Sequence, residues 1–181
     1  MNVFFTADEH YGHGHVIAYC RRPFANLEEM DEALIERHNA LVKKKDLVYH
    51  LGDFAFRYHE PYLRRLHGRH VLILGNHDAS RKKHVGTAWE TIEPVLLLKI
   101  SGRQIWLSHY AHRVWPSSHH GAWHLFGHSH GNLEPFGKSL DVGVDSHDFR
   151  PWSLDEIEEV LAAREVAVVD HHKGWMNRRE P

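Results

Sequence analysis

The sequence predicts an α/β domain, because short apolar segments of strand character alternate with segments whose apolar residues recur at helical spacing. The chain has 181 residues, of which 42% are hydrophobic, and this is enough to bury a core without disulfides. It contains no repeat, low-complexity segment or Pro/Ser-rich linker that would divide it. We therefore expect residues 1–181 to form a single domain.

The charge and the cysteine content exclude several classes of protein. A formal net charge of -2 provides no broad basic surface, so neither nucleic acid nor a membrane is indicated as a partner. The single cysteine, Cys20, allows neither an intramolecular disulfide nor a cysteine-based zinc site. The N-terminus has no signal-peptide pattern and no apolar stretch is long enough to span a membrane, so we expect a cytoplasmic protein.

The first predicted elements are a strand and a long helix. Residues 2–7 (NVFFTA) form an apolar run that stops at a polar loop, as a strand does. Helical spacing is clearest over residues 26–45, where Asn26 can cap the helix and Glu28 and Glu29 suit the positive end of its dipole.

The rest of the chain alternates in the same way. The segments 47–54 and 71–78 each consist of an apolar strand followed by polar residues at its end, and further strands are predicted over residues 95–100, 104–109, 123–128 and 140–144. A second helix begins at Ser153, where Glu156 completes a capping box. Residues 166–169 (VAVV) would close a sheet, and residues 170–181 form either a tail or an interface without recognisable chemistry.

Polar side chains follow most of these strands, at the position where active sites of α/β proteins collect. The strand ends contain Asp8-x-His10, Gly52-Asp53, Gly75-Asn76-His77-Asp78, Ser108-His109 and Gly127-His128-Ser129-His130. In extended backbone, residues i and i+2 share a face, so each D-x-H or H-x-H pair is expected to converge. The donors are oxygen and nitrogen without sulfur, a set that suits Mn, Fe or Zn better than Ca.

The order of these motifs resembles that of the calcineurin-like metallophosphoesterases, in particular the small bacterial-type enzymes. Their motifs are D-x-H, G-D, G-N-H-D/E, H and G-H-x-H, and all five occur in that order between residues 8 and 130. The resemblance implies two β-sheets packed as a sandwich and flanked by helices, the four-layer αββα metallophosphoesterase fold. It also implies an enzyme, a metal-dependent phosphoesterase.

The resemblance further implies two divalent transition-metal ions, with Mn expected and Fe, Zn or Ni compatible with the same donors. It assigns Asp8, His10 and His130 to one ion and Asn76, His109 and His128 to the other, with Asp53 as the bridge. Two ions about 3.5 to 4 Å apart can activate a bridging hydroxide and stabilise an in-line displacement at phosphorus. With two aspartates and the hydroxide included, the site keeps a charge of about +1, which favours an anionic phosphoryl group.

Four further residues are candidates for the chemistry beside the ions. The histidine of the G-N-H-D/E motif faces the substrate in the family, where it could stabilise the transition state or protonate the leaving oxygen. The resemblance therefore implies that His77 is catalytic. Asp78 is its expected partner, fixing its tautomer. Arg57 has two possible roles: it binds the substrate phosphate, or it is a surface residue at the start of a helix. His13 follows the first motif closely enough to reach substrate.

The remaining histidines have weaker claims to function. His50 and His70 lie within predicted strands and outside any motif, so a structural role is expected. His124 shares a strand face with His128 by parity alone. The segment 110–124 either shapes the substrate pocket or joins the core.

The predicted function is hydrolysis of a phosphodiester by the metal-bridging hydroxide, with a nucleotide, cyclic nucleotide or similar small phosphoester as substrate. The motif GNHD, in place of GNHE, and the altered surroundings of Arg57 argue against a protein phosphatase. A small-molecule phosphomonoesterase is the nearest alternative, followed by a nuclease, for which the charge provides no binding stripe. A binding module that retains the fold without activity predicts missing ligands, and every motif position is filled.

Overall fold

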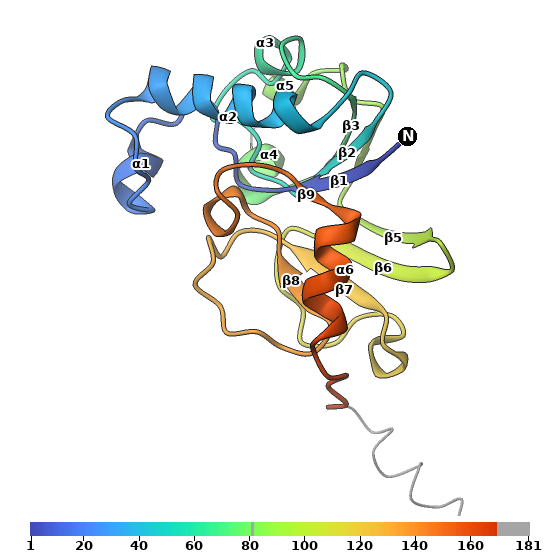
Figure 1. Ribbon diagram of the computed structural model, residues 1–181. Coiled ribbons are helices and arrows are strands. Elements are labelled where there is room, and N and C mark those ends of the chain that lie inside the picture. The colour runs from blue at the N-terminus through green and yellow to red at the C-terminus, as the bar shows by residue number, and fades with distance from the viewer. Residues whose placement is uncertain (81, 170–181) are drawn as a thin grey trace, which may run out of the picture.

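Two β-sheets that pack face to face form the centre of the structure (Figure 1). A computed structural model describes residues 1–80 and 82–169. The five-stranded sheet has the order β4-β3-β2-β1-β9, and the four-stranded sheet has the order β5-β6-β7-β8. The predicted fold class, an α/β sandwich of two sheets flanked by helices, is confirmed.

The five-stranded sheet is mostly parallel. Its strands are β1 (Val3–Thr6), β2 (Leu47–His50), β3 (Arg69–Ile73), β4 (Thr91–Glu93) and β9 (Trp152–Ser153). β1 to β4 pair in parallel, and β9 joins β1 in the antiparallel direction. Because parallel strands end on the same side, the loops that follow β1, β2 and β3 meet at one edge of the sheet.

The four-stranded sheet repeats this arrangement. Its strands are β5 (Val95–Ile100), β6 (Arg103–Ser108), β7 (Trp123–Phe126) and β8 (Ser139–Asp141). β5 and β6 form an antiparallel hairpin, whereas β6, β7 and β8 are parallel. An isolated parallel bridge between Ala7 and Gly143 joins the two sheets just beyond β1 and β8. The carboxyl ends of both sets of parallel strands therefore lie near one another.

Alternating strand residues fill the space between the sheets. Phe5 and Ile73 of the first sheet meet Ile105 and Leu125 of the second in one cluster, and all four side chains are fully buried. Helix α6 (Leu154–Ala162) adds further buried side chains to this cluster, and the predicted capping box begins it. The core therefore has the inward-facing alternation expected of a sandwich.

Helices cover the other face of the five-stranded sheet (Figure 1). The helices in this part of the chain are α1 (His15–Tyr19), α2 (Leu27–Leu41), α3 (Glu60–Leu63), α4 (Asn76–Ser80) and α5 (Lys82–Val85). Asn26 caps α2 as predicted, since its side chain accepts a hydrogen bond from the backbone N–H of Glu29 at 2.9 Å. No helix among residues 1–80 and 82–169 is both long and apolar enough to cross a bilayer.

Several segments differ from the sequence-based expectations. Helix α2 ends at Leu41 instead of residue 45, because Val42 is already extended, with ψ at 135°. Residues 166–169 do not form the predicted strand. The edge strand β8 that they would join has its Ser139 carbonyl occupied by the side chain of Arg164. Strands β4 and β9 are too short to give a sequence pattern, and segment 170–181 lies outside the described residues.

His124 anchors a loop against the outer face of the four-stranded sheet. It is fully buried, its Nδ1–H donates to the carbonyl of Trp106 at 3.1 Å, and its Nε2 accepts from the backbone N–H of His112 at 2.9 Å. Trp115 packs on its ring, with centroids 5.2 Å apart. These bonds require the neutral Nδ1–H tautomer, and burial lowers the pKa of His124 to about 4. His124 is thus a structural residue of the core.

This geometry makes His124 a source of acid sensitivity. Because the folded-state pKa lies below the unfolded value of about 6.5, the unfolded chain binds more protons between those two values. The contribution of His124 to stability is complete above pH 6.5 and is lost as the pH falls toward 4. The loss amounts to about 3 kcal/mol in the free energy of unfolding, at about 1.4 kcal/mol per pKa unit.

We expect His124→Phe to reduce this acid sensitivity. The variant lowers stability at pH 7 by about 1–3 kcal/mol, because the Trp106 carbonyl and the His112 N–H lose their partner. It then loses less stability than the wild type between pH 6.5 and pH 4, as measured by urea unfolding of metal-free protein. Exposed His120, changed to Gln, is the control. Equal pH dependence in His124→Phe and the wild type would contradict the assignment.

Candidate metal centre

The seven candidate ligands follow strands of both sheets and gather at their shared edge. Asp8 and His10 follow β1, Asp53 follows β2, Asn76 begins α4 after β3, His109 follows β6, and His128 and His130 follow β7. The parallel direction of these strands is the reason that residues so distant in the sequence meet.

The first group of ligating atoms comes from Asp8, His10 and His130. Each offers one oxygen or nitrogen, and these atoms lie within 4.8 Å of one another. Asp8 and His10 are buried, whereas His130 is partly exposed. The grouping matches the set that the family resemblance assigns to one ion.

The second group contains Asp53, His109 and His128, whose ligating atoms also lie within 4.8 Å of one another. Asn76 adjoins this group, because its Oδ1 is 3.0 Å from Nε2 of His109. Tyr110 lies over the group, with its ring 4.5 Å from that of His128. The grouping corresponds to the set that the resemblance assigns to the other ion.

Asp53 lies between the two groups. Its Oδ2 is 3.9 Å from Nε2 of His10 in the first group and 3.6 Å from Nε2 of His109 in the second. Its Oδ1 accepts a hydrogen bond from the backbone N–H of His77 at 2.9 Å. One carboxylate oxygen is therefore within reach of both groups, as a shared ligand requires.

The backbone at the ligands is left-handed and not extended. Five of the seven candidates have positive φ: Asp8 (58°), His10 (55°), Asp53 (56°), His128 (67°) and His130 (48°). The expectation that the i, i+2 pairs converge through extended backbone is wrong, because β1 and β7 end before their ligands. Instead, tight turns aim each side chain separately. Such conformations cost of order 1–3 kcal/mol each and persist where the surrounding contacts enforce them.

Two of the ligand histidines are held in the tautomer that exposes Nε2. Nδ1–H of His109 donates to the carbonyl of Leu51 at 2.8 Å, and Nδ1–H of His130 donates to Oδ2 of Asp145 at 2.7 Å. Burial lowers the pKa of His109, and it lowers that of His10 well below the usual range. Neutral imidazoles are the form that binds a metal ion.

The carboxylates of the site fit a cation. Asp8 is fully buried, and its Oδ2 accepts from the backbone N–H of His128 at 2.7 Å, whereas its Oδ1 has no hydrogen-bond partner among the described residues. Burial, together with repulsion from Asp53 and Asp141, raises the pKa of Asp8 well above its usual value. A divalent ion would satisfy the orphan oxygen and offset the repulsion, so the donor set fits the metal that the resemblance implies.

His77 faces the site, but its expected partner does not. The His77 side chain is 33% exposed and its Nε2 lies 3.8 Å from Oδ2 of Asp53. The Asp78 carboxylate is buried, where its Oδ2 accepts from the backbone N–H groups of Asp53 at 2.8 Å and Gly75 at 2.9 Å. Its Oδ1 lies 3.4 Å from Nε2 of His59. Asp78 therefore braces the Asp53 loop instead of orienting His77.

His13 lies beside the first group. Nδ1 of His13 is 3.5 Å from Nδ1 of His10, and its ring stacks on Phe56 at 4.6 Å. Arg57, the residue after Phe56, is exposed, and among the described residues no hydrogen bond or ion pair joins it to a candidate ligand. The structure thus brings His13 to the site but not Arg57.

A buried chain of polar side chains lies behind the first group. Oε1 of Glu9 is 2.6 Å from Nδ1 of His50, whose Nε2 is 3.0 Å from Nδ1 of His70. Burial raises the pKa of Glu9 to about 7 and lowers those of His50 and His70 to about 3. His50 and His70 are therefore neutral residues of the core and not ligands, in keeping with their position outside the motifs.

Sequence reasoning missed Arg22 and Asp145, which contact the first group. Asp145 follows β8, so the rule that polar residues follow strands would have found it. Arg22 lies between α1 and α2, and no sequence pattern marks it. Cys20 is also close, but burial raises the pKa of its thiol to about 11, which disfavours the thiolate that binds metals.

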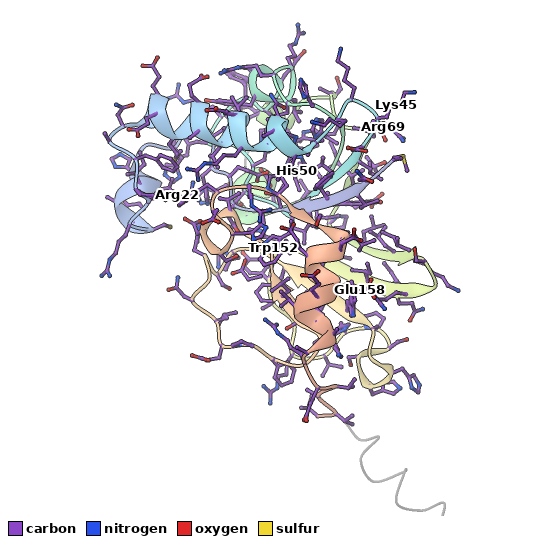
Figure 2. All side chains as sticks on the ribbon, in the orientation of Figure 1. Arg22, Lys45, His50, Arg69, Trp152 and Glu158 are labelled. Carbon is purple, nitrogen blue, oxygen red and sulfur yellow. The ribbon has the colours of Figure 1, made fainter. Side chains whose placement is uncertain are left out.

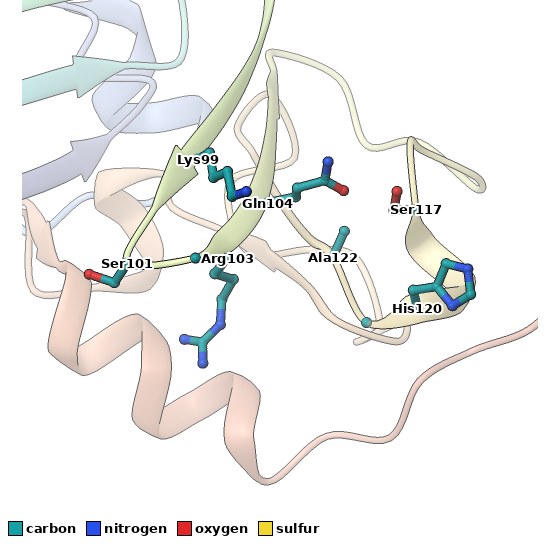
Figure 3. A pocket seen from close by; sticks show the side chains of 9 residues that line it. Lys99, Ser101, Arg103, Gln104, Ser117, His120 and Ala122 are labelled. Carbon is teal, nitrogen blue, oxygen red and sulfur yellow. The ribbon is translucent and has the colours of Figure 1, made fainter.

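A separate pocket lies at the opposite end of β6 (Figure 3). Its volume is about 490 Å³, and its walls come from the β5–β6 turn and from the segment around η1 (Ser118–His120). Lys99 and Gln104 line it on one side and His120 on the other. None of the seven candidate ligands contributes to it, so it is not part of the candidate metal centre.

Gly127 allows the close approach on which Asp8 depends. A Cβ at this position would lie 2.6 Å from Oδ2 of Asp8 and 2.5 Å from Cβ of Ala7. We expect Gly127→Ala to displace the Asp8 carboxylate and weaken Mn²⁺ binding at least about tenfold, with about 1–3 kcal/mol lost from stability. Isothermal titration and thermal unfolding measure both effects. Gly14→Ala is the control, since its Cβ meets Leu27 at 3.8 Å. Unchanged Mn²⁺ affinity in Gly127→Ala would contradict this role.

Comparison with known proteins identifies relatives of the chain. No protein-family model matches it. The uncharacterized protein MJ1445 of Methanocaldococcus jannaschii is 31% identical over 176 residues, covering 91% of this chain and 93% of that protein. The gene 66 protein of Mycobacterium phage L5 is 28% identical over 196 residues, covering 88% and 94%.

Solved structures agree with the fold. The protein of unknown function AQ665 from Aquifex aeolicus superposes with a TM-score of 0.70 at 24% identity, covering 88% of this chain and 98% of that one. A predicted phosphoesterase from Streptococcus pneumoniae and an archaeal phosphodiesterase superpose with TM-scores of only 0.43 and 0.44, a likeness too weak to inform the function. Because MJ1445 is 31% identical along nearly the whole chain, the protein belongs to the MJ1445 family.

Proposed function

We propose that this protein is a dinuclear-metal-dependent phosphoester hydrolase. The observation that carries the proposal is the position of Asp53. One of its two carboxylate oxygens, Oδ2, is 3.9 Å from Nε2 of His10 in the first group and 3.6 Å from Nε2 of His109 in the second. The motifs that supply these atoms occur in the order found in calcineurin-like metallophosphoesterases. A buried aspartate oxygen without a partner, in Asp8, provides an independent reason for a cation at this position.

Each group of residues has a separate task in this proposal. Asp8, His10 and His130 would hold one divalent ion and Asn76, His109 and His128 the other, with Asp53 shared. The ions would supply Lewis acidity and a deprotonated water at neutral pH. The chain itself fixes the ligand tautomers through Leu51 and Asp145, and it excludes water from the inner oxygens by burial.

His77 is the residue best placed to act on the substrate. Its ring is partly exposed, whereas its backbone N–H is fixed on Asp53. From this position Nε2 can donate a hydrogen bond to a phosphoryl oxygen or a proton to the leaving oxygen. We keep His77 as the catalytic residue and assign Asp78 to support of the Asp53 loop.

The rim of the site favours a diester over a monoester. Aromatic rings flank it on both sides, His13 with Phe56 beside the first group and Tyr110 beside the second. A phosphodiester has two organic substituents, so both flanks can contact it, whereas a monoester would engage only one. We therefore propose a small phosphodiester as substrate, such as a cyclic nucleotide or a nucleotide esterified by a second alcohol, with a phosphomonoester as the alternative.

We expect the Mn²⁺-loaded protein to hydrolyse bis-p-nitrophenyl phosphate faster than p-nitrophenyl phosphate. Chelation should abolish the activity, and Mn²⁺ should restore it. The candidate ligands are neutral or anionic, so none of them can supply the positive charge of the missing ion. Release of p-nitrophenol measures both rates. Preference for the monoester would support the alternative substrate class. If neither ester were hydrolysed with Mn, Fe, Zn or Ni, the proposed hydrolase activity would be contradicted.

His77→Ala and Asp53→Asn should separate catalysis from metal binding. His77→Ala keeps both ions while kcat falls by about 10²–10⁴, the usual contribution of a general acid or of a donor to the transition state. Asp53→Asn reduces the metal content itself, because one neutral amide replaces the shared carboxylate. Elemental analysis and kinetics on the same preparations compare the two. Parallel loss of metal and activity in His77→Ala would make His77 a ligand or a structural residue.

A further inference from the structure

A buried arginine lies behind the first group of candidate ligands. Arg22 lies just after α1 (Figure 2), and its side chain has no exposed surface. Its guanidinium binds Asp145 through two hydrogen bonds, from Nε to Oδ1 at 2.8 Å and from Nη2 to Oδ2 at 2.7 Å. Asp145 is itself nearly buried, with 7% of its side chain exposed. The pair is neutral as a whole, so it changes the net charge of the site little.

The same guanidinium holds the loop that carries Asp8 and His10. Nη2 donates to the carbonyl of Asp8 at 2.6 Å, and Nη1 donates to the carbonyl of Glu9 at 2.9 Å. Both Asp8 and His10 have left-handed backbone, at φ of 58° and 55°. Hydrogen bonds to the carbonyls of this loop are contacts of the kind that keep a strained backbone in place.

Asp145 connects the arginine to the third ligand of the group. Its Oδ2 accepts from Nη2 of Arg22 and also from Nδ1–H of His130, both at 2.7 Å. The imidazole therefore presents Nε2 as its free nitrogen. A carboxylate on the remote nitrogen of a ligand histidine fixes the tautomer and raises the basicity of the ligating nitrogen.

We infer that Arg22 and Asp145 are positioning residues that assemble the Asp8–His10–His130 metal site. One guanidinium fixes the loop with two of the ligands and, through Asp145, the ring of the third. Lysine could not replace it, because an ammonium lacks the planar fork that binds a carboxylate and two carbonyls together. The inference rests on the proposed function only insofar as this group binds a metal ion.

The test is Mn²⁺ binding by Asp145→Asn, measured by isothermal titration and electron paramagnetic resonance. In the asparagine one of the two acceptor oxygens becomes an NH₂ group that can only donate, so the side chain cannot keep both hydrogen bonds from Arg22 together with the one from His130. We expect affinity at one of two sites to fall about 10–100-fold while the other is unchanged. The spectrum should change from that of a spin-coupled Mn²⁺ pair to that of an isolated ion.

Controls separate positioning from loss of the fold. Glu158→Gln removes a surface ion pair, with Arg103 at 2.8 Å, and should bind Mn²⁺ as the wild type does. If Asp145→Asn does not fold, the double variant Arg22→Met with Asp145→Asn leaves no unpaired buried charge. It should fold and show the same selective loss. Long-range ¹H–¹⁵N correlation in the metal-free protein should show the Nδ1–H tautomer of His130 in the wild type and a tautomer mixture in the variant.

Each outcome decides between the two proposals. Two ions bound with unchanged affinity in Asp145→Asn or in the double variant would overturn the positioning role. A wild type that binds two ions but hydrolyses no ester contradicts the proposed function alone, and the Asp145→Asn titration still decides this inference. A wild type that binds none of Mn²⁺, Fe²⁺, Zn²⁺ and Ni²⁺ overturns both.

Discussion

The buried carboxylates of Asp8 and Asp53 impose the main physical constraint on this structure. Both lie almost without exposure at the meeting point of the two sheets, and repulsion from Asp53 contributes to the raised pKa of Asp8. Burying two such groups side by side is costly unless hydrogen-bond donors or an opposite charge compensate them. Three neighbouring features are consistent with this need: neutral histidines, backbone N–H donors aimed at the carboxylates, and a glycine at position 127 that leaves room for the Asp8 carboxylate.

The turns that carry the ligands are strained, and buried polar groups support them from behind. Arg22 binds the carbonyls of the Asp8 loop, and Asp78 accepts from the backbone N–H groups of Asp53 and Gly75. Neither residue contributes an atom to the two groups of ligating atoms. Their role explains why charged residues are buried at positions outside the candidate metal centre. Hydrogen bonds from buried polar groups thus support the candidate ligands from behind, and such support restricts the geometry of the ligands.

Local patterns in the sequence predicted the regular elements well where they are long. The caps of α2 and α6, at Asn26 and Ser153, were predicted because a helix start is a local interaction among four residues. The strand expected over residues 166–169 does not form, and the Ser139 carbonyl of the edge strand β8 accepts a hydrogen bond from the Arg164 side chain instead of from another strand. Strands β4 and β9 were missed because two or three residues carry no periodic signal; their pairing partners define them.

The sequence by itself determined the identity and grouping of the candidate ligands, because each follows a strand and the order of motifs resembles a known family. Tertiary structure alone decided how they converge, since left-handed turns and not extended backbone aim Asp8, His10, His128 and His130. It also decided which polar residues act behind them. Asp78 turns away from His77, whereas Arg22 joins Asp8 and Asp145 from 14 and 123 residues away. Such contacts depend on how the sheets pack together, and no local sequence pattern encodes contacts between residues so far apart in the chain.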